Sequence, residues 1–592
     1  MRRAIAPLLL ALLPAACLEV KDQAPPMCRV DSDCNTGAGE ICDEGVCWGN
    51  PPAGMFAAVV SPPSERPDLV SREVLMLPIA DNGWMDDIHL DTAVALKGRL
   101  QAVCGTACDG RTLSATMTVT RPSIFNGGPG VREKVTVDDG TFDLLLPVTR
   151  DGDDPYTVTV VPGDRDTSGS GQSLAQLVPP LQVRIPVGKS ITSSVLEVTA
   201  VGAPRIQGNV VHGVPGNYVG LAGYRVVALG RWAADQPMTE VSTVDFTSID
   251  GYFSILLSRG LVGFVEIVAR PTGSTLRPEL HLGSVPADKD ASGKLLALPS
   301  VSTGDEIPVS LLVDYKRDNG EIAPVGGARV MLTSSSGELS TTSARFSTEG
   351  ITGDDGVVHL RLLDLLQLRS GYRLSIIPPP GSTASALFEK PYVWGATQQR
   401  LGTRIAITGT VLGADGQPMK DVSVTARPSV RFLWSLEPGP QEFLGAIPTA
   451  TMVTKENGVF VLFVDHALSN TTGQATTVWG HYDLTFEPTL KARAPSWSQN
   501  DLELPRDDTQ ATAALGEVRL PDAAYVRGAV FDDANARVEG AEVRLFLVQT
   551  DEGVCQDTRF EPVSCPIPPL LMGRAASEKD GLARLILPRV PR

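Results

Sequence analysis

The sequence has few aromatic residues, few histidines and no excess of basic residues. Phe, Trp and Tyr make up 5% of its 592 residues, and only six residues are histidine. Acidic residues outnumber basic ones by 68 to 51, which gives a formal net charge of −17. Proteins that bind nucleic acid depend on patches of Lys and Arg that neutralise phosphates, and no basic run interrupts this acidic chain. We therefore expect no nucleic-acid partner.

Motifs for catalysis are also missing. The chain contains no Gly-x-Ser-x-Gly, Ser-x-x-Lys or His-Glu-x-x-His, so the residues that serine and metal hydrolases place in these motifs are not there. Gly188-Lys189-Ser190 resembles the end of a phosphate-binding loop, but Val183 occupies the position of its first glycine. We therefore expect a protein without a catalytic site, a cofactor or a resident metal ion.

The first seventeen residues are typical of a bacterial export signal. Two arginines precede an apolar run of 13 residues, 4–16, which is too short to cross about 30 Å of hydrocarbon. No later stretch is long and apolar enough to span a membrane. The run ends in Leu13-Pro14-Ala15-Ala16-Cys17. This resembles the lipobox of bacterial lipoproteins, although Pro14 replaces the usual leucine.

The resemblance implies that residues 1–16 are removed as a signal peptide and that Cys17 is lipidated. Acyl chains would then hold the protein on a membrane. A cleaved secretory signal that leaves Cys17 free is the alternative. Leu18 in place of Asp implies, by the same resemblance, sorting to the outer membrane of the cell envelope.

Eight further cysteines fall into three local clusters. The total of nine is odd, which in an exported protein leaves one thiol over, and lipidation of Cys17 leaves an even number. A zinc site would need closer Cys-x2-Cys pairs or nearby histidines, so we expect disulfides instead. The clusters are Cys28, Cys34, Cys42 and Cys47; Cys104 and Cys108; and Cys555 and Cys565.

The first cluster has the spacing Cys-x5-Cys-x7-Cys-x4-Cys, with several Asp and Gly residues between. It resembles the short Cys-rich segment near the start of many surface lipoproteins of myxobacteria and their relatives. Four cysteines allow three pairings, and the resemblance implies Cys28–Cys42 with Cys34–Cys47. We expect residues 17–50 to form a lipidated, disulfide-rich neck whose aspartates stabilise turns rather than bind calcium.

After the neck, the chain repeats a turn dipeptide followed by alternating apolar residues. Asp-Gly and Asn-Gly favour the positive φ angles of tight hairpin turns, so each dipeptide predicts a hairpin of two antiparallel strands. Successive dipeptides are 102 to 123 residues apart, which is a repeat of domain size. They are Asp139-Gly140, Asp250-Gly251, Asp355-Gly356, Asn457-Gly458 and Asp580-Gly581.

A second repeated mark is an aromatic residue followed by alternating apolar residues and a proline. Period-two alternation predicts a strand with one buried face. The segments run Phe56–Pro62, Tyr156–Pro162, Phe264–Pro271, Tyr372–Pro378 and Tyr482–Pro488. With strands of the form Gly-x-Val, as at Gly208, Gly409 and Gly528, these marks resemble carboxypeptidase regulatory-like domains, the small prealbumin-like β-sandwich. Helix signals are nearly missing, apart from a leucine-rich run over 360–368.

The resemblance implies an all-β protein, a tandem array of about five Ig-like or prealbumin-like β-sandwich domains after the signal peptide and the disulfide-rich neck. The first aromatic strand precedes any turn dipeptide, and the last dipeptide has no aromatic strand after it. Either the chain starts and stops part-way through a unit, or the terminal sandwiches are incomplete. We expect a strand-containing lead-in segment over 51–92 and sandwiches over 93–202, 203–306, 307–402, 403–521 and 522–592, numbered 1 to 5 below.

Two acidic loops share the pattern Asp-x-Asp-x-Ser-Gly after the aromatic strand of their unit. Such spacing resembles the start of a calcium-binding loop, but the twelfth positions, Ala175 and Pro299, lack its bidentate glutamate. We expect acidic loops that keep strand edges soluble, with calcium as the weaker alternative. The loop residues are Asp164, Asp166 and Ser168, and Asp288, Asp290 and Ser292.

These features favour a non-enzymatic cell-envelope lipoprotein that presents its sandwich array as a binding, scaffolding or adhesion surface. Its partners would be the membrane, through the lipid anchor, and an unidentified protein or polysaccharide. Carbohydrate binding is one alternative, since related folds bind sugars on exposed aromatic residues; an accessory subunit of an exported enzyme or secretion assembly is another. The candidate aromatic residues outside strand cores are Trp232, Trp434, Trp479 and Trp497.

Overall fold

A computed structural model describes residues 26–589 apart from several segments. The backbone alone is described for β35 (Ala467–Asn470), β36 (Thr476–Trp479), β42 (Gly553–Gln556) and β43 (Pro562–Cys565). The segments left out are 106–107, 109, 126–129, 151–152, 165–171, 235, 237, 275, 301, 318, 337–341, 430–448, 466, 471–475, 490–491, 506–511, 549–552, 557–561 and 566–569.

The described chain is nearly all β-strand, which confirms the predicted fold class. In these ranges, the one α-helix is α1 (Leu366–Arg369), beside the short 3-10 turns η1 (Asp31–Asp33), η2 (Thr36–Ala38) and η3 (Leu174–Gln176). The leucine-rich run over 360–368 divides between a strand and this helix. None of the described helices is long and apolar enough to cross a bilayer.

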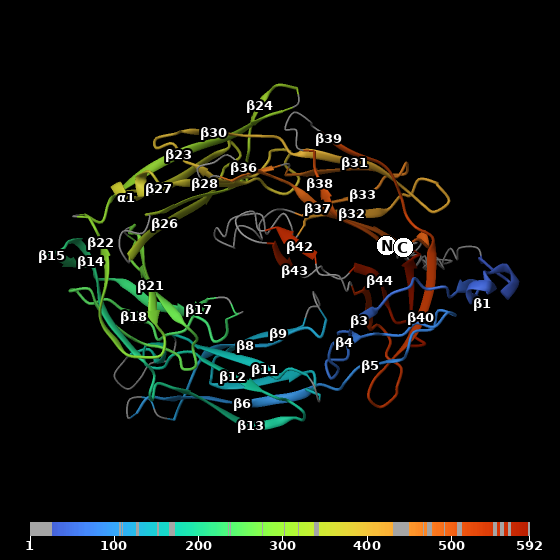
Figure 1. Ribbon diagram of the computed structural model, residues 1–592, viewed down its shortest axis with the longest axis horizontal. Helices are drawn as coiled ribbons and strands as arrows, with labels where there is room; N and C mark the ends of the chain where they lie inside the picture. The colour runs from blue at the N-terminus through green and yellow to red at the C-terminus, as the bar shows by residue number, and fades with distance from the viewer. Residues whose placement is uncertain are drawn as a thin grey trace, which may run out of the picture.

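Each sandwich consists of two facing sheets, and Figure 1 shows one sheet of each pair on the outside of a ring of sandwiches and the other toward its centre. In every outer sheet the central strand pairs antiparallel with one neighbour and parallel with the other. Short strands β7 (Arg111–Thr112), β15 (Asn217–Gly220) and β24 (Ile322–Pro324) extend them. The outer sheets of sandwiches 1 to 4 are β10 (Thr141–Leu146), β6 (Val94–Val103) and β13 (Ile191–Thr199); β19 (Tyr252–Leu256), β14 (Arg205–Val214) and β22 (Ala291–Leu298); β27 (Val357–Asp364), β23 (Asp305–Lys316) and β30 (Gln398–Leu401); and β34 (Val459–Val464), β31 (Ile405–Leu412) and β39 (Thr512–Arg519).

The inner sheets are antiparallel throughout. Those of sandwiches 2 and 3 join into one continuous sheet, because their edge strands β21 and β26 pair. The inner strands are β12 (Leu181–Ile185), β11 (Tyr156–Pro162), β8 (Ala115–Arg121) and β9 (Val131–Val137); β21 (Glu279–Pro286), β20 (Phe264–Pro271), β16 (Tyr224–Gly230), β17 (Thr239–Glu240) and β18 (Asp245–Phe246); β29 (Leu387–Pro391), β28 (Arg373–Ile377), β25 (Arg329–Ser335) and β26 (Thr342–Ile351); and β38 (Trp497–Glu503), β37 (His481–Pro488), β32 (Val422–Pro428) and β33 (Ala450–Val453).

The prediction that each turn dipeptide joins a hairpin is wrong. The strand before each turn belongs to the inner sheet and the strand after it to the outer sheet; β9 pairs with β8, for example, whereas β10 pairs with β6. The two strands form no ladder with each other, and a single bridge, Ser577 to Ala583, crosses the last turn. The turn glycine has a positive φ in every case, as predicted, but its carbonyl accepts an N–H from the central outer strand. The same local chemistry therefore carries the chain from one layer to the other.

Buried tyrosines explain most of the aromatic marks. Tyr156, Tyr372 and Tyr482 are almost fully buried at the start of an inner strand, and their hydroxyls donate to the backbone carbonyls of Pro147, Leu363 and Asp465. Burial raises the pKa of Tyr156 to about 12. Sandwich 2 differs, because Phe264 is exposed and the buried tyrosine there is Tyr224, on the neighbouring strand β16.

Sandwich 5 is built from both ends of the chain. Its inner sheet has the order β4-β3-β41-β44, in which strand β3 (Phe56–Ser61) pairs with strand β41 (Glu542–Leu547). Residues 51–92 thus supply the aromatic strand that the C-terminal unit lacks, and they form one sandwich with 522–592 rather than a separate lead-in segment. The remaining strands are β4 (Arg72–Leu75) and β44 (Leu570–Ala576) in the inner sheet, and β5 (Ile88–His89), β40 (Ala523–Phe531) and β45 (Leu582–Pro588) in the outer sheet.

One hydrophobic core holds the two ends of the chain together. Phe56, Ala58 and Val60 from the N-terminal segment are buried among Val543, Leu585 and their neighbours from the C-terminal segment. Burial of apolar side chains is the main favourable term in folding. The sandwich therefore depends on both segments for its stability.

The sandwiches follow one another round a closed circuit, in which the first strands lie beside the last ones at the right of Figure 1. Backbone and side-chain contacts join each neighbouring pair. The seam between sandwiches 5 and 1 is made by the Glu73 carboxylate, which accepts the N–H groups of Ile124 and Gly130, both at 2.9 Å, and by Phe125 packed on Phe546. A hydrogen bond from Ser258 Oγ to Pro180 O joins sandwiches 1 and 2, and the pairing of β21 with β26 joins sandwiches 2 and 3. Hydrogen bonds from Ala386 N to Asp465 Oδ1 and from Tyr525 Oη to Arg493 O join sandwich 4 to sandwiches 3 and 5.

Candidate functional site

The described part of the neck, residues 26–50, contains two disulfides. Cys28 is bonded to Cys42 and Cys34 to Cys47, with Cα–Cα distances of 5.9 and 5.5 Å, which is the pairing that the resemblance implied. Among the described residues, Cys28, Cys34 and Cys47 form the one group whose ligand atoms lie close enough together for a metal ion. Because all three sulfurs are in disulfides, they are not free as thiolate ligands.

The two aspartates of the neck stabilise its turns. The Asp33 carboxylate accepts the N–H groups of Arg29 and Val30, and these hydrogen bonds lower its pKa. Asp31 Oδ1 accepts the N–H of Cys42 at 2.8 Å. Both carboxylates therefore order the backbone between the disulfides.

The neck adds a strand to the outer sheet of sandwich 5. Strand β1 (Ile41–Asp43) pairs with strand β2 (Val46–Trp48), and β2 runs parallel to β40 at Tyr525. Strand β5 lies parallel to the far end of the same strand, at Val530 and Phe531. In the other sandwiches one parallel strand borders the central outer strand. The neck thus fills part of an edge position that residues 51–92 leave open.

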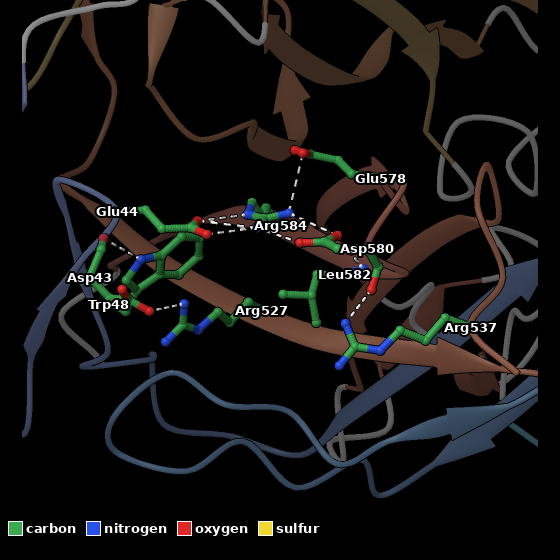
Figure 2. A network of polar contacts seen from close by, with 9 residues as sticks. All are labelled: Asp43, Glu44, Trp48, Arg527, Arg537, Glu578, Asp580, Leu582 and Arg584. Carbon is green, nitrogen blue, oxygen red and sulfur yellow. Dashed lines mark hydrogen bonds and ion pairs between the residues drawn. The ribbon is translucent and has the colours of Figure 1, made fainter. Parts of the chain in front are cut away.

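Arg527, on the middle of β40, is the main contact between the neck and the sandwich (Figure 2). Its Nη1 donates to Asp43 Oδ2 at 2.6 Å, and its guanidinium lies 4.9 Å from the centre of the Trp48 ring and 5.2 Å from that of Trp84. Trp48 Nε1 in turn donates to the carbonyl of Asp43. The hydrogen bond from Arg527 lowers the pKa of Asp43. A desolvated guanidinium close to both indole rings favours one docked position of the neck.

A second arginine, Arg584, ties the neck to the last turn dipeptide (Figure 2). Its guanidinium contacts Glu44 of the neck at 3.1 Å, Asp580 at 2.8 Å and Glu578 at 3.3 Å. The hydrogen bond to Asp580 raises the pKa of Arg584 and lowers that of Asp580. Asp580 also accepts the N–H of Leu582, so the turn is fixed at the same time.

A groove of about 670 Å³ lies where the neck, sandwich 4 and sandwich 5 meet. Its lining includes Asp33 and Glu40 of the neck, Asp415 and Met419 of sandwich 4, and Arg589 of sandwich 5. Arg589 donates to the Glu40 carboxylate. The neck therefore contacts sandwich 5 and borders, together with sandwich 4, one groove.

Arg527 and Arg584 were not predicted as contact residues. The available signal was the arginine at an outward position of the strand after Asp580-Gly581 and the tryptophan directly after Cys47. Neither pattern is specific, because the neck residues that meet these arginines lie almost the whole chain away.

The other predicted cysteines are only partly described. Cys104 and Cys108 are joined by a disulfide, with their Cα atoms 5.5 Å apart. Cys555 and Cys565 lie in the paired strands β42 and β43, but their side chains are outside the described part. Cys17 also lies outside the described residues, so its lipidation stays a prediction.

The two acidic loops are not equivalent in the structure. Asp164 follows the aromatic strand β11, whereas Asp288 follows β21, the next strand along, so the prediction that both loops follow the aromatic strand is wrong. Asp290 Oδ1 accepts the N–H of Arg205 at 2.7 Å and so joins its loop to β14. Ser292 is exposed in β22, and Asp166 and Ser168 lie outside the described residues.

The tryptophans considered for sugar binding have structural contacts where they are described. Trp232 packs against the core of sandwiches 2 and 3 and donates to the carbonyl of Arg259. Trp497 packs against the core of sandwich 4. Trp434 and the side chain of Trp479 lie outside the described part. Trp232 and Trp497 therefore supply no open aromatic platform.

No known family model matches the chain, and no curated protein matches it. Among solved structures, the Streptococcal ancillary pilin is 9% identical, with 52% of this chain and 99% of that one covered and a TM-score of 0.18. The B repeat units of the collagen-binding protein of Staphylococcus aureus are 11% identical, with 72% and 99% covered and a TM-score of 0.12. The full-length RrgB pilus protein of Streptococcus pneumoniae is 8% identical, with 72% and 99% covered and a TM-score of 0.14. Similarity at this level carries no argument about function, and the fold rests on the strands described above.

Proposed function

We propose that this protein is a lipid-anchored scaffold of the bacterial cell envelope whose ring of β-sandwiches presents loops as a binding or adhesion surface. The observation that carries the proposal is the docking of the disulfide-bonded neck onto a sandwich made from both chain ends. This arrangement joins the expected site of lipidation to a closed body, which suits a structural role.

The distance between anchor and body supports this role. Eight residues lie between Cys17 and Pro26, the first described residue, and the nine steps from one Cα atom to the next can span at most about 30 Å. Acyl chains on Cys17 would hold the N-terminus in the membrane. The neck and the adjoining face of the ring would then stay close to the lipid surface.

The proposed binding function belongs to the loops. The strands and turns repeat between sandwiches because they build the fold, whereas connecting segments can vary without loss of the core. The ligand would be a protein or a polysaccharide, and no catalytic step is part of the proposal.

Mass spectrometry of the detergent-extracted protein tests the anchor. We expect a mature chain that begins at Cys17, carries acyl groups and has the mass deficit of four disulfides. The variant Cys17→Ala should move from the membrane fraction to the soluble fraction. The variant Ser193→Ala, on the exposed edge of sandwich 1, is the control and should stay in the membrane fraction. An unmodified Cys17 in the parent protein would overturn the proposal.

A further inference from the structure

Strand β34 of sandwich 4 is apolar on both faces. All six of its residues, Val-Phe-Val-Leu-Phe-Val, are hydrophobic. Phe460, Leu462 and Val464 are buried in the core, whereas Val461 and Phe463 on the opposite face remain 36% and 38% exposed. Continuous apolar strands are typical of strands covered on both sides. Within the described residues, the outer face of β34 has no such cover.

The corresponding strands of the other sandwiches carry polar residues on this face. Counted from the turn glycine, the positions of Val461 and Phe463 are held by Asp143 and Leu145 in sandwich 1, Ser254 and Leu256 in sandwich 2, and His359 and Arg361 in sandwich 3. In sandwich 5 the first position is Arg584, which contacts the neck. Sandwich 4 is therefore the one in which both positions are apolar.

The neighbouring strands continue this surface with uncharged residues beside Val461 and Phe463, whereas the row through Val459 and Thr410 ends at the exposed Glu517. Ala406 pairs with Phe463 and Thr408 with Val461 on β31, and Ala514 pairs with Thr408 on β39. We call Val461, Phe463, Ala406, Thr408 and Ala514 the apolar face. On an acidic protein of net charge −17, these uncharged residues are a candidate contact surface.

The apolar face begins beside the neck. The turn at Gly458 that starts β34 lies against Pro418 and Met419. Both of these residues line the groove that the neck residues Asp33 and Glu40 also line. The face therefore extends from the neighbourhood of the neck along β34.

We propose that the apolar face lies against the lipid surface of the membrane that holds the anchor. The proposal rests on the proposed lipidation of Cys17, because the nine residues up to Pro26 limit how far the neck can be from the bilayer. The transfer of phenylalanine and valine side chains from water into the interfacial region lowers the free energy, and Glu517 lies at the border of the apolar face rather than between Val461 and Phe463. The ring would thus touch the membrane at sandwich 4 as well as through its acyl chains.

Tryptophan reporters in lipid vesicles test this proposal. The lipidated protein with Phe463→Trp is reconstituted into phosphatidylethanolamine–phosphatidylglycerol vesicles with and without brominated acyl chains, and the emission of the parent protein is subtracted. We expect a blue shift of the added tryptophan and a loss of its emission with the brominated lipid. Leu145→Trp is the matched control, since Leu145 is exposed at the same position after the turn in sandwich 1, and it should show neither change.

Val461→Trp provides a second reporter on the same face and should also be quenched. Vesicle flotation separates the two proposals: protein that does not float contradicts the anchor, whereas protein that floats with an unquenched tryptophan at 461 and 463 overturns the membrane contact. Equal quenching at Leu145 would overturn it as well. So would a lipid-independent emission shift that grows with protein concentration, because that result would assign the apolar face to a second copy of the chain.

Discussion

In three of the turn dipeptides, the glycine lies against the backbone of the central outer strand; these are Gly251, Gly356 and Gly458. A Cβ atom on Gly251 would be 2.1 Å from the carbonyl oxygen of Val210, and one on Gly458 would be 2.5 Å from that of Val411. Contacts this short cannot be relieved by a side-chain rotation. The glycines are therefore required by the crossing between layers as well as by their positive φ.

Gly251→Ala should destabilise sandwich 2 more than Gly260→Ala does. Both glycines have positive φ angles, +77° and +75°, but a Cβ on Gly260 would meet nothing within 4 Å. The left-handed conformation alone costs an alanine about 1–2 kcal/mol, and the clash at Gly251 should add about 1–3 kcal/mol. Native-state hydrogen exchange of the β14 and β19 amides measures the loss of stability in each of the two variants. Equal losses of stability in the two variants would show that the positive φ, and not the close approach to Val210, requires a glycine at position 251.

The contacts between the neck and the two arginines could not be predicted from the sequence. An arginine at an outward strand position is an ordinary surface residue by its pattern. The docked neck gives Arg527 its carboxylate partner, Asp43, and adds Glu44 to the local partners Glu578 and Asp580 of Arg584. Pairings between residues at opposite ends of a chain have no local signature.

At the scale of elements, the seam between sandwiches 2 and 3 contains a buried histidine. His281 Nδ1 lies 2.8 Å from Glu266 Oε1, and its Nε2 lies 2.6 Å from Glu279 Oε1. Arg345 of β26 faces the same cluster from across the seam, 3.7 Å from Glu266, and Arg270 contacts Glu279 from β20. The imidazolium is thus held between two carboxylates on the strand that joins the two sandwiches.

The protection of the backbone amides in this seam against hydrogen exchange should depend on pH. Burial tends to lower the pKa of His281, but the hydrogen bonds that its ring donates to Glu266 and Glu279 outweigh burial and raise the pKa above the ordinary value. The stabilisation is therefore complete below about pH 6.5 and is lost as the pH rises through the raised pKa. The pKa values of both carboxyls are lowered, so their contribution is lost only as the pH falls through those lowered values.

Hydrogen exchange of the β21 and β26 amides, corrected for intrinsic rates, measures this dependence. His281→Gln should remove it and weaken the seam by about 1–3 kcal/mol, because the two carboxylates lose their charged partner. The control His359→Gln changes an exposed histidine of sandwich 3 and should leave the profile unchanged. Hydrogen exchange in this seam that does not change with pH in the parent protein, after correction for intrinsic rates, would contradict the role of His281.

The strands themselves were predictable, whereas their pairing across the turns was not. Alternation after each turn dipeptide correctly indicated a strand with one buried face, as in the exposed–buried pattern of β10. A tight turn with an Asx hydrogen bond, such as Asp139 to the N–H of Thr141, occurs both in hairpins and between layers. The local sequence therefore could not show that the two strands lie in different sheets.

At the scale of the whole molecule, the ring is closed by the N-terminal strands. The sequence indicated that the first aromatic strand lacked a preceding turn and that the last turn lacked a following aromatic strand. It left open whether the two part-units meet. The pairing of Phe56 with Leu547 answers this, and it depends on a contact between distant segments that no local pattern contains.

Phe56→Ala should therefore loosen the C-terminal strands. Phe56 is 4% exposed in the shared core, and truncation of such a side chain costs about 3–5 kcal/mol. Hydrogen exchange should become faster in β41 and β45, at the other end of the sequence, and stay unchanged in β14. The control Phe264→Ala removes an aromatic side chain that is 61% exposed and should have little effect. Unchanged exchange in β41 would contradict a single shared core.

The shared sandwich also determines the order in which the molecule can be completed during secretion. On the proposed export route the chain would cross a membrane from its amino end, so sandwiches 1 to 4 would emerge whole and could form one after another. Strand β3 emerges before all of them, yet its partner β41 comes last. Its apolar side chains must stay uncovered, or be held by a chaperone, until translocation is nearly finished.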